Sequence, residues 1–343
     1  MWVLILAGFV LLFIGGEALV RGSVGVARKF GMSELIIGLT LVGFGTSLPE
    51  LVTSLQALSE GAVGLSIGNV MGSNVANIML VIGAAALVKT IHTNPRALMR
   101  DGLFMVLVTA VFVGVIWFDA FTRWTGIVFV LVLLIYLIGS IFLDQRNNSA
   151  GGQLHADEAN EIEANDPLWR SIMFTVIGIA GVIFGARFLV SGGSDAARLF
   201  GVSETVIGIS IVAIGTSLPE LVTSIVAARK GKADVALGNV LGSNVFNILG
   251  ILGVSAIVYP FSLMVPESLI QPTLDQAMQI GALTSLVTWT DIGTLVLSLV
   301  LLILFAYTGR KLARWEGGVL LAGYLLYIGL SFDLIPTLPG LGG

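Results

Sequence analysis

The chain has 343 residues, of which 56% are apolar and only 11% are charged, and its mean hydropathy is +0.99. Soluble domains are about 45–50% apolar and about 25% charged, so this composition is typical of a membrane protein. The net charge of −4 offers no basic surface for nucleic acid, and a chain without cysteine has no disulfides, thiolate metal sites or thiol catalysis. Because the sequence also lacks the Ser/His, paired-Asp and HExxH patterns of hydrolases, we expect neither an enzyme nor a bound cofactor.

Apolar runs of about 20 residues each predict ten transmembrane helices and an all-α polytopic membrane fold. The first run lacks the basic start of a cleaved signal peptide, so we expect it to remain as the first helix. The runs lie at 2–21, 34–58, 63–88, 102–119, 124–143, 168–190, 204–228, 234–259, 291–309 and 315–332. Two five-helix repeats, 1–143 and 168–343, therefore flank a polar segment.

The polar segment 144–167 is acidic and is expected to be a solvated connector, with a regulatory cation sensor as the alternative. A second segment, 263–289, is amphipathic and contains Pro266 and Pro272. It fits either a loop with an interfacial helix or a re-entrant piece.

Lys and Arg residues are distributed unevenly between the two sides of the predicted bundle. With the N-terminus outside, only Arg123, Arg187 and Arg198 fall outside, and the other basic residues fall inside. The positive-inside rule therefore predicts external termini and a cytoplasmic linker, in a multi-pass protein of the plasma (inner) membrane. Because each half has five helices, the second half would enter the membrane from the opposite side. Inverted repeats are typical of secondary transporters, although channels are also built from them.

Two strings of the first half recur in the second half. GTSLPELVTS lies at 45–54 and again at 215–224, while GNVMGSNVANI at 68–78 corresponds to GNVLGSNVFNI at 238–248. Both pairs are separated by the same 170 positions, so no gap has accumulated between the motifs.

Each first motif has a glutamate, Glu50 or Glu220, directly after a proline in an apolar run. An ionisable residue inside a membrane segment is costly, which makes these glutamates the leading candidates for a functional site. Other acidic residues have ordinary explanations. Glu34, for example, follows Ser33 at a predicted helix start, where a capping serine and a first-turn carboxylate are both favourable.

The prolines beside the glutamates predict a break in each helix. Pro49 has no N–H for the preceding turn, and its ring pushes Leu48 away from helical angles. The break should release backbone carbonyls from Gly43 onward, which is tolerated within a membrane only beside a cavity or inside protein. Pro219 repeats the argument, so the corresponding carbonyls begin at Ala213.

The candidate ligands are all oxygen atoms, which selects hard cations such as Na⁺, K⁺, Ca²⁺ or Mg²⁺ and argues against zinc or copper. Two glutamates neutralise one divalent ion, and many flexible neutral oxygens suit Ca²⁺, while the same cage could instead hold several Na⁺ ions. The candidates are Thr46, Ser47, Glu50, Ser73, Asn77, Thr216, Ser217, Glu220, Ser243 and Asn247, with the carbonyls of Gly43 and Ala213. The second motifs add further oxygen donors at Asn69, Asn74, Asn239 and Asn244.

The strings GTSLPE and GNV-x-GSN-x-x-NI, each present in both halves, resemble the two α-repeats of the Ca²⁺/cation antiporter superfamily, in its sodium/calcium exchanger branch. The resemblance extends over the ten-helix layout. It implies exchange of cytoplasmic Ca²⁺ for incoming Na⁺ by alternating access, with Glu50 and Glu220 as shared ligands. It implies ligand roles also for the Thr and Ser before each Leu-Pro, and for the Ser and last polar residue of each second motif. The first and sixth helices, 2–21 and 168–190, would slide as a gating pair.

Two details of the motifs bear on the coupling ion. Proton-coupled calcium exchangers of the superfamily typically carry Gly-Asn-x-x-Glu, whereas GTSLPE looks like the sodium-coupled type. Potassium-dependent members, and some prokaryotic ones, carry Asp at the position of Asn247, so the asparagine argues against K⁺ cotransport. We therefore expect a monomeric Na⁺/Ca²⁺ antiporter in the lipid bilayer. A H⁺/Ca²⁺ antiporter and a passive cation channel are the alternatives.

Overall fold

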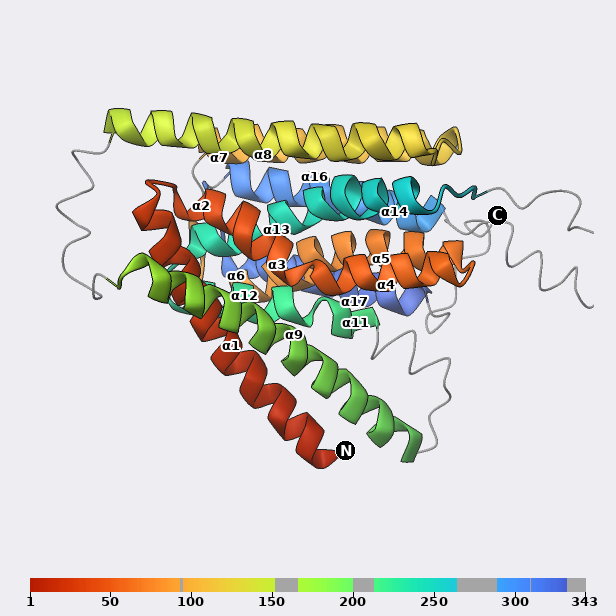
Figure 1. Cartoon of the computed structure of the whole chain (residues 1–343), viewed down its shortest axis with the longest axis horizontal. Coiled ribbons are helices and arrows are strands. Elements are labelled where there is room, and N and C mark those ends of the chain that lie inside the picture. The colour runs from red at the N-terminus through yellow and green to blue at the C-terminus, as the bar shows by residue number, and fades with distance from the viewer. Residues whose placement is uncertain (93–94, 152–165, 200–212, 264–288, 309, 332–343) are drawn as a thin grey trace, which may run out of the picture.

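The structure of the chain, a computed structural model, is almost entirely helical, as the all-α class predicts (Figure 1). It describes residues 1–92, 95–151, 166–199, 213–263, 289–308 and 310–331. Its helices, π-helical segments (η) and strands are α1 (Trp2–Lys29), α2 (Glu34–Ile37), η1 (Gly38–Val42), α3 (Gly43–Thr46), α4 (Leu48–Ser59), α5 (Val63–Ala76), η2 (Asn77–Val81), α6 (Ile82–Val88), β1 (Ile91–His92), α7 (Pro95–Trp117), α8 (Arg123–Gly151), α9 (Leu168–Leu199), α11 (Ala213–Thr216), α12 (Leu218–Arg229), α13 (Ala233–Val245), η4 (Phe246–Ile251), α14 (Leu252–Val258), α16 (Trp289–Thr308), β2 (Lys311–Leu312) and α17 (Arg314–Ser331).

Seven of the described helical stretches are long and apolar enough to cross a membrane. An eighth span results if the bent pair Glu34–Thr46 and Leu48–Ser59 is counted as one. The helix α12 lies in the predicted run 204–228, and the first part of this run falls outside the described residues. Nearly all of the amphipathic segment 263–289 also falls outside them. The 18-residue helix α17 occupies the run predicted at 315–332.

Some helices extend beyond the apolar runs that predict them. The first helix continues past residue 21 to Lys29 and ends just before Gly31, where φ is +62°. The helix α8 continues to Gly151, well into the segment predicted as linker, most of which lies outside the described residues. The physical reason is that hydropathy measures the length within the membrane, whereas a helix ends at a residue that interrupts its hydrogen bonds.

The segments that carry the repeated motifs lie in the middle of the bundle (Figure 1). The helix α13 packs against α2, η1 and α12, while α4 packs against α5. Outside this centre, α8 packs against α14, and α6 packs against α17. The short strands β1 and β2 pair antiparallel, with Ile91 opposite Leu312. The largest buried apolar cluster draws on α5, η2, α13 and η4, so the candidate site residues are held by a packed core.

The helices α1 and α9 pack along each other and run diagonally to the other helices, with the N-terminus at the far end of the pair and contacts to α12 at its inner end (Figure 1). Glycines spaced seven residues apart line both sides of the contact: Gly8, Gly15, Gly22, Gly178, Gly185 and Gly192. A Cβ atom added at Gly15 would lie 2.7 Å from the backbone nitrogen of Val182, so the two backbones are in direct contact. The first glycine of α1 faces Leu189 and the last faces Thr175, which makes the pair antiparallel.

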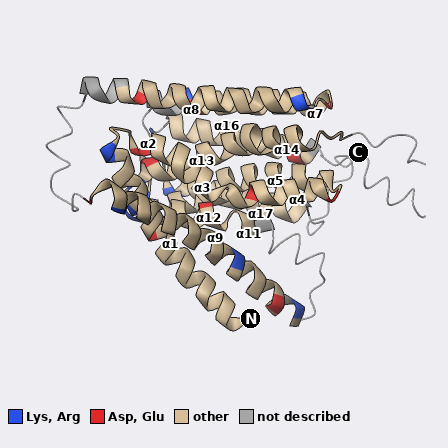
Figure 2. Cartoon of the chain, viewed as in Figure 1, with Lys and Arg blue, Asp and Glu red and all other residues tan. Residues whose placement is uncertain are grey.

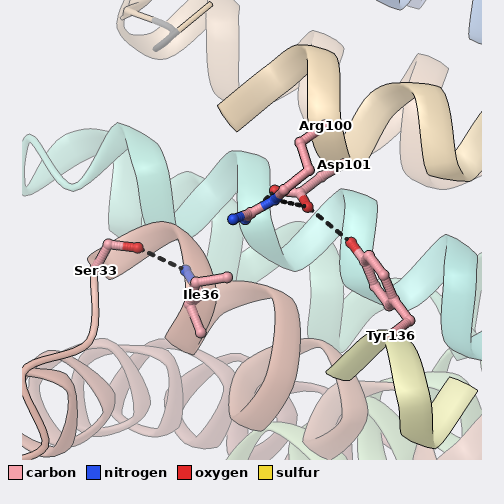
Figure 3. Close-up of polar contacts among 5 residues, drawn as sticks. All are labelled: Ser33, Ile36, Arg100, Asp101 and Tyr136. Carbon is pink, nitrogen blue, oxygen red and sulfur yellow. Dashed lines mark hydrogen bonds and ion pairs between the residues drawn. The ribbon is translucent and has the colours of Figure 1, made fainter. Parts of the chain in front are cut away.

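Charged residues gather mainly toward the ends of the helices (Figure 2). Figure 3 shows an ion pair near the start of α7, in which the partly exposed Arg100 donates two hydrogen bonds of 2.8 Å to the buried Asp101. Tyr136 of α8 donates a third, of 3.1 Å, so both carboxylate oxygens of Asp101 are satisfied by neighbouring side chains. The same view shows Ser33 accepting a bond of 3.3 Å from the backbone of Ile36, which confirms the predicted cap of α2.

Candidate cation site

Both repeated motifs contain a broken helix, as their prolines predict. In the first motif α3 ends at Thr46 and α4 begins at Leu48, with a bend of 43° between the helices on either side. The irregular residue is Ser47, with φ −86° and ψ 6°, and its counterpart Ser217 has φ −88° and ψ 4°. The prediction that Leu48 itself leaves helical angles is wrong. Leu48 begins the new helix and Pro49 occupies its first turn, where a missing N–H costs nothing.

The two glutamates are fully buried, and a serine of the first motif makes a hydrogen bond to the glutamate of the second copy. The Ser47 hydroxyl donates a hydrogen bond of 2.9 Å to Oε1 of Glu220. Glu50 lies close enough to Glu220 for the two carboxyl groups to interact electrostatically. Both carboxylate oxygens of Glu50 and Oε2 of Glu220 have no hydrogen-bond partner among the described residues. The break thus brings together two acidic groups that neighbouring protein atoms leave largely unsatisfied.

The second motifs contribute amide groups at the same place. Asn77 donates a hydrogen bond of 3.0 Å to Asn244, which joins the two repeats. Oδ1 of Asn77 and both side-chain polar atoms of Asn247 are buried and have no partner within the described part of the chain. Of the two serines, Ser73 is buried, and Ser243 donates a bond of 3.1 Å to the carbonyl of Gly43.

The remaining predicted ligands lie at the broken ends. The prediction that the break releases the Gly43 carbonyl is wrong, because this carbonyl keeps the helical bond from the Ser47 backbone nitrogen, at 3.2 Å, and also accepts from the Thr46 hydroxyl at 3.3 Å. The buried hydroxyl oxygen of Ser217 has no partner in the regions that the structure describes. Thr216 is half-buried at the end of α11, and Ala213 is the first residue of that helix.

This arrangement can bind a hard cation. An unpartnered buried carboxylate or amide oxygen is unfavourable, and a cation held between such oxygens removes that penalty. The described residues hold no cluster of three or more His, Cys, Asp or Glu, so neutral oxygens must complete any coordination sphere. Two carboxylates among hydroxyl and amide oxygens match the ligands of Ca²⁺ or Na⁺ and lack those of zinc or copper.

Comparison with known proteins agrees with this chemistry. A family model described as "Sodium/calcium exchanger protein" matches residues 1–142 and 170–332. This chain is a member of that family. It is 34% identical to the sodium/calcium exchanger MaX1 of Methanosarcina acetivorans, over 96% of this chain and 98% of MaX1. It is 31% identical to the inner membrane protein YrbG of Escherichia coli, over 98% of both chains.

A solved structure of the sodium-calcium exchanger NCX_Mj, soaked with 10 mM Na⁺ and zero Ca²⁺, has a similar fold. The TM-score is 0.77 at 32% identity, and the match covers 95% of this chain and 97% of NCX_Mj. The resemblance to the sodium/calcium exchanger branch is therefore confirmed, and the chain is a membrane protein of a family of ion transporters.

Two features of this exchanger family member are not among the sequence predictions. The first is a π-helical stretch in each second motif, η2 from Asn77 and η4 from Phe246, which widens the helix at an asparagine whose side-chain oxygen has no partner among the described residues. Such stretches are frequent at functional sites. The second is the glycine contact between α1 and α9. Its signal is present in the sequence, because Gly8, Gly15 and Gly22 recur in α9 at the same 170-position offset as the motifs.

Proposed function

We propose that this member of the sodium/calcium exchanger family is a secondary active antiporter that exchanges cytoplasmic Ca²⁺ for extracellular Na⁺ by alternating access. The observation that carries the proposal is the pair of fully buried glutamates, Glu50 and Glu220, on two broken helices from the two repeats. Three of their four carboxylate oxygens lack a hydrogen-bond partner among the described residues. Because isolated buried charge is costly, the glutamates are best explained as ligands of a cation that enters and leaves.

The ion selectivity follows from the charge and ligand count. Ca²⁺ accepts six to eight oxygen ligands in flexible geometry, and two carboxylates balance its charge. Na⁺ ions can occupy the same oxygens, so either ion set fills the site and excludes the other, which is the condition for exchange. The ligands in this proposal are Glu50, Glu220, Thr46, Ser47, Thr216, Ser217, Ser73, Asn77, Ser243 and Asn247, with the carbonyls of Gly43 and Ala213.

The proposal includes a membrane layout of ten spans in two inverted repeats, with the termini outside and the acidic linker in the cytoplasm. The glycine contact supports it, since α1 and α9 carry glycines at equivalent repeat positions and pack antiparallel. Equivalent helices of inverted repeats must run in opposite directions. The uneven distribution of Lys and Arg supports the same orientation in the plasma (inner) membrane. The names of the relatives MaX1 and NCX_Mj support the choice of ions.

Purified protein in sodium-loaded vesicles tests the proposal. With no pH gradient and the membrane potential clamped, an outward Na⁺ gradient should drive Ca²⁺ into the vesicles, and external Na⁺ should compete with Ca²⁺. Glu50→Gln vesicles provide the matched control. Uptake that requires a pH gradient instead of Na⁺ would indicate H⁺/Ca²⁺ exchange. Ca²⁺ movement without any trans Na⁺ and without ion competition would indicate a channel.

A further inference from the structure

A second pair of asparagines, Asn69 and Asn239, makes the same contacts in both repeats. The Asn69 amide nitrogen donates to the backbone carbonyl of Glu50 at 3.2 Å and to the Ser54 hydroxyl oxygen at 2.9 Å. The Asn239 amide nitrogen donates to the carbonyl of Glu220 at 3.4 Å and to the Ser224 hydroxyl oxygen at 2.9 Å. An amide nitrogen carries two hydrogens, so each asparagine can make both bonds at once. Each asparagine therefore links its own helix, α5 or α13, by hydrogen bonds to the helix that carries the glutamate, α4 or α12.

Asn239 has a third contact that crosses between the repeats. Its Oδ1 lies 3.2 Å from the hydroxyl of Thr46, and it shares that single hydrogen with the carbonyls of Val42 at 3.1 Å and Gly43 at 3.3 Å. Asn239, Thr46 and Ser224 are all fully buried, so water does not compete for these bonds. One side chain thereby connects the glutamate turn of α12, the helix α13 and the end of α3.

The asparagines of the second motifs differ in whether their side-chain amides already have hydrogen-bond partners in the protein. The side-chain oxygens of Asn247 and Asn77 are unpartnered within the described residues, as expected of oxygens that can bind a cation. The amide donors of Asn239, in contrast, are already used on the glutamate turn. Its orientation is thus set by protein groups, as for a residue that supports ligands rather than one that binds the ion.

The break explains why such support is needed. The turn that starts α12 follows the irregular residue Ser217, so the preceding helix restrains it less than a continuous helix would. Two bonds restrain Glu220 from outside its own helix: its backbone carbonyl accepts from Asn239 at 3.4 Å, and its carboxylate accepts from Ser47 at 2.9 Å. The first bond holds the backbone from which the carboxylate extends.

We propose that Asn239, with Asn69 as its counterpart, is a positioning residue that holds the glutamate turn in the geometry required to bind Ca²⁺. Through Thr46, Asn239 also couples the two broken helices. This inference rests on the proposed function, because it assumes that Glu220 is an ion ligand.

Direct Ca²⁺ binding to the purified protein, measured by calorimetry, tests the positioning role apart from transport. Asn239→Leu removes all three bonds and should weaken Ca²⁺ binding about tenfold or more, the usual effect of losing a group that orients a metal ligand. Ser224→Ala leaves the bond to Glu220 in place and should weaken binding about threefold. Ser298→Ala is the matched control, since Ser298 is an equally buried serine bonded within its own helix, α16, and Ca²⁺ affinity should stay unchanged.

Asn239→Asp distinguishes positioning from direct ligation. Aspartate keeps an acceptor for Thr46 but loses both amide donors, so a positioning role predicts weaker Ca²⁺ binding. A ligand role predicts equal or tighter binding, because the new carboxylate would face the ion, and that result overturns the proposal. Thermal unfolding of each variant completes the test. Variants that unfold at lower temperature but bind Ca²⁺ like the wild type would make Asn239 merely structural and overturn the proposal as well.

The same measurements separate this inference from the proposed function. If the wild type binds Ca²⁺ but Na⁺ drives no uptake, the exchange function is wrong, while the affinities of the variants still decide the role of Asn239. If the wild type exchanges the ions and the Asn239 variants keep its Ca²⁺ affinity, only the positioning role is wrong. A wild type that binds no Ca²⁺ overturns both.

Discussion

Replacing Gly15 with alanine should push α1 and α9 apart. The added Cβ would lie 2.7 Å from the Val182 nitrogen and 2.8 Å from the Gly181 carbonyl carbon, whereas ordinary van der Waals contact begins at 3.4 Å. Both atoms belong to the backbone, so no side-chain rotation relieves the overlap and the helices must separate by roughly 0.7 Å. Overpacking of this kind costs about 1–3 kcal/mol.

The control is Gly139→Ala in the middle of α8, where no described atom lies within 4 Å of the added Cβ. Both variants gain the same helix propensity, up to about 1 kcal/mol, so their difference isolates the steric cost. We expect Gly15→Ala to be about 1–3 kcal/mol less stable than Gly139→Ala when unfolding in mixed micelles is followed by circular dichroism. Equal stabilities would refute the direct backbone contact between α1 and α9.

Three further predictions concern buried charge. Glu50→Gln, and likewise Glu220→Gln, should reduce Na⁺-driven Ca²⁺ uptake at least about a hundredfold with expression retained, because one lost charge at about 4 Å removes roughly 4 kcal/mol of attraction. Asn247→Asp adds a third carboxylate and should change the Na⁺ dependence of uptake, measured as initial rate against Na⁺ concentration. Asp101→Asn leaves Arg100 without its ion partner and should lower stability by about 2–3 kcal/mol, while the KM for Ca²⁺ stays unchanged. Breaking a fully buried pair would cost more, but Arg100 is partly exposed.

Each of these predictions has a result that would contradict it. Near-normal uptake by either glutamine variant would remove that glutamate from the ion site. An unaltered Na⁺ dependence of Asn247→Asp would make position 247 peripheral. A changed KM for Ca²⁺ in Asp101→Asn would connect the ion pair of α7 to the transport site, contrary to its separate bonding.

Much of the candidate site can be predicted because its chemistry is local and occurs twice. Pro49 and Glu50 are adjacent, so the sequence predicts a helix break beside a buried acid, and the second copy removes coincidence as an explanation. The break lies at Ser47, within the region predicted from Pro49, but Leu48 is helical because the proline is accommodated in the first turn of a new helix. Local sterics favour a break in this region but do not select its residue.

The contacts between the repeats cannot be predicted in the same way. The bond from Ser47 to Glu220 depends on how two distant helices cross, and a shift of a fraction of a turn would offer other partners. The π-helical stretches at Asn77 and Phe246 differ from α-helix by one residue per turn and carry no local sequence signal. The helix ends beyond the membrane, as at Gly151, are likewise invisible to a hydropathy criterion.

The glycine contact between α1 and α9 has a mechanical consequence. Where side chains lie between two helices, a change of rotamer can accommodate a small displacement of one helix. Two backbones in direct contact cannot adjust in this way. The 28 residues of α1 extend about 42 Å, and α9 lies against them from Gly8 to Gly22. A change in the separation or tilt of α1 must therefore be matched by α9, because no side chain lies between the two helices at these glycines to take up the difference.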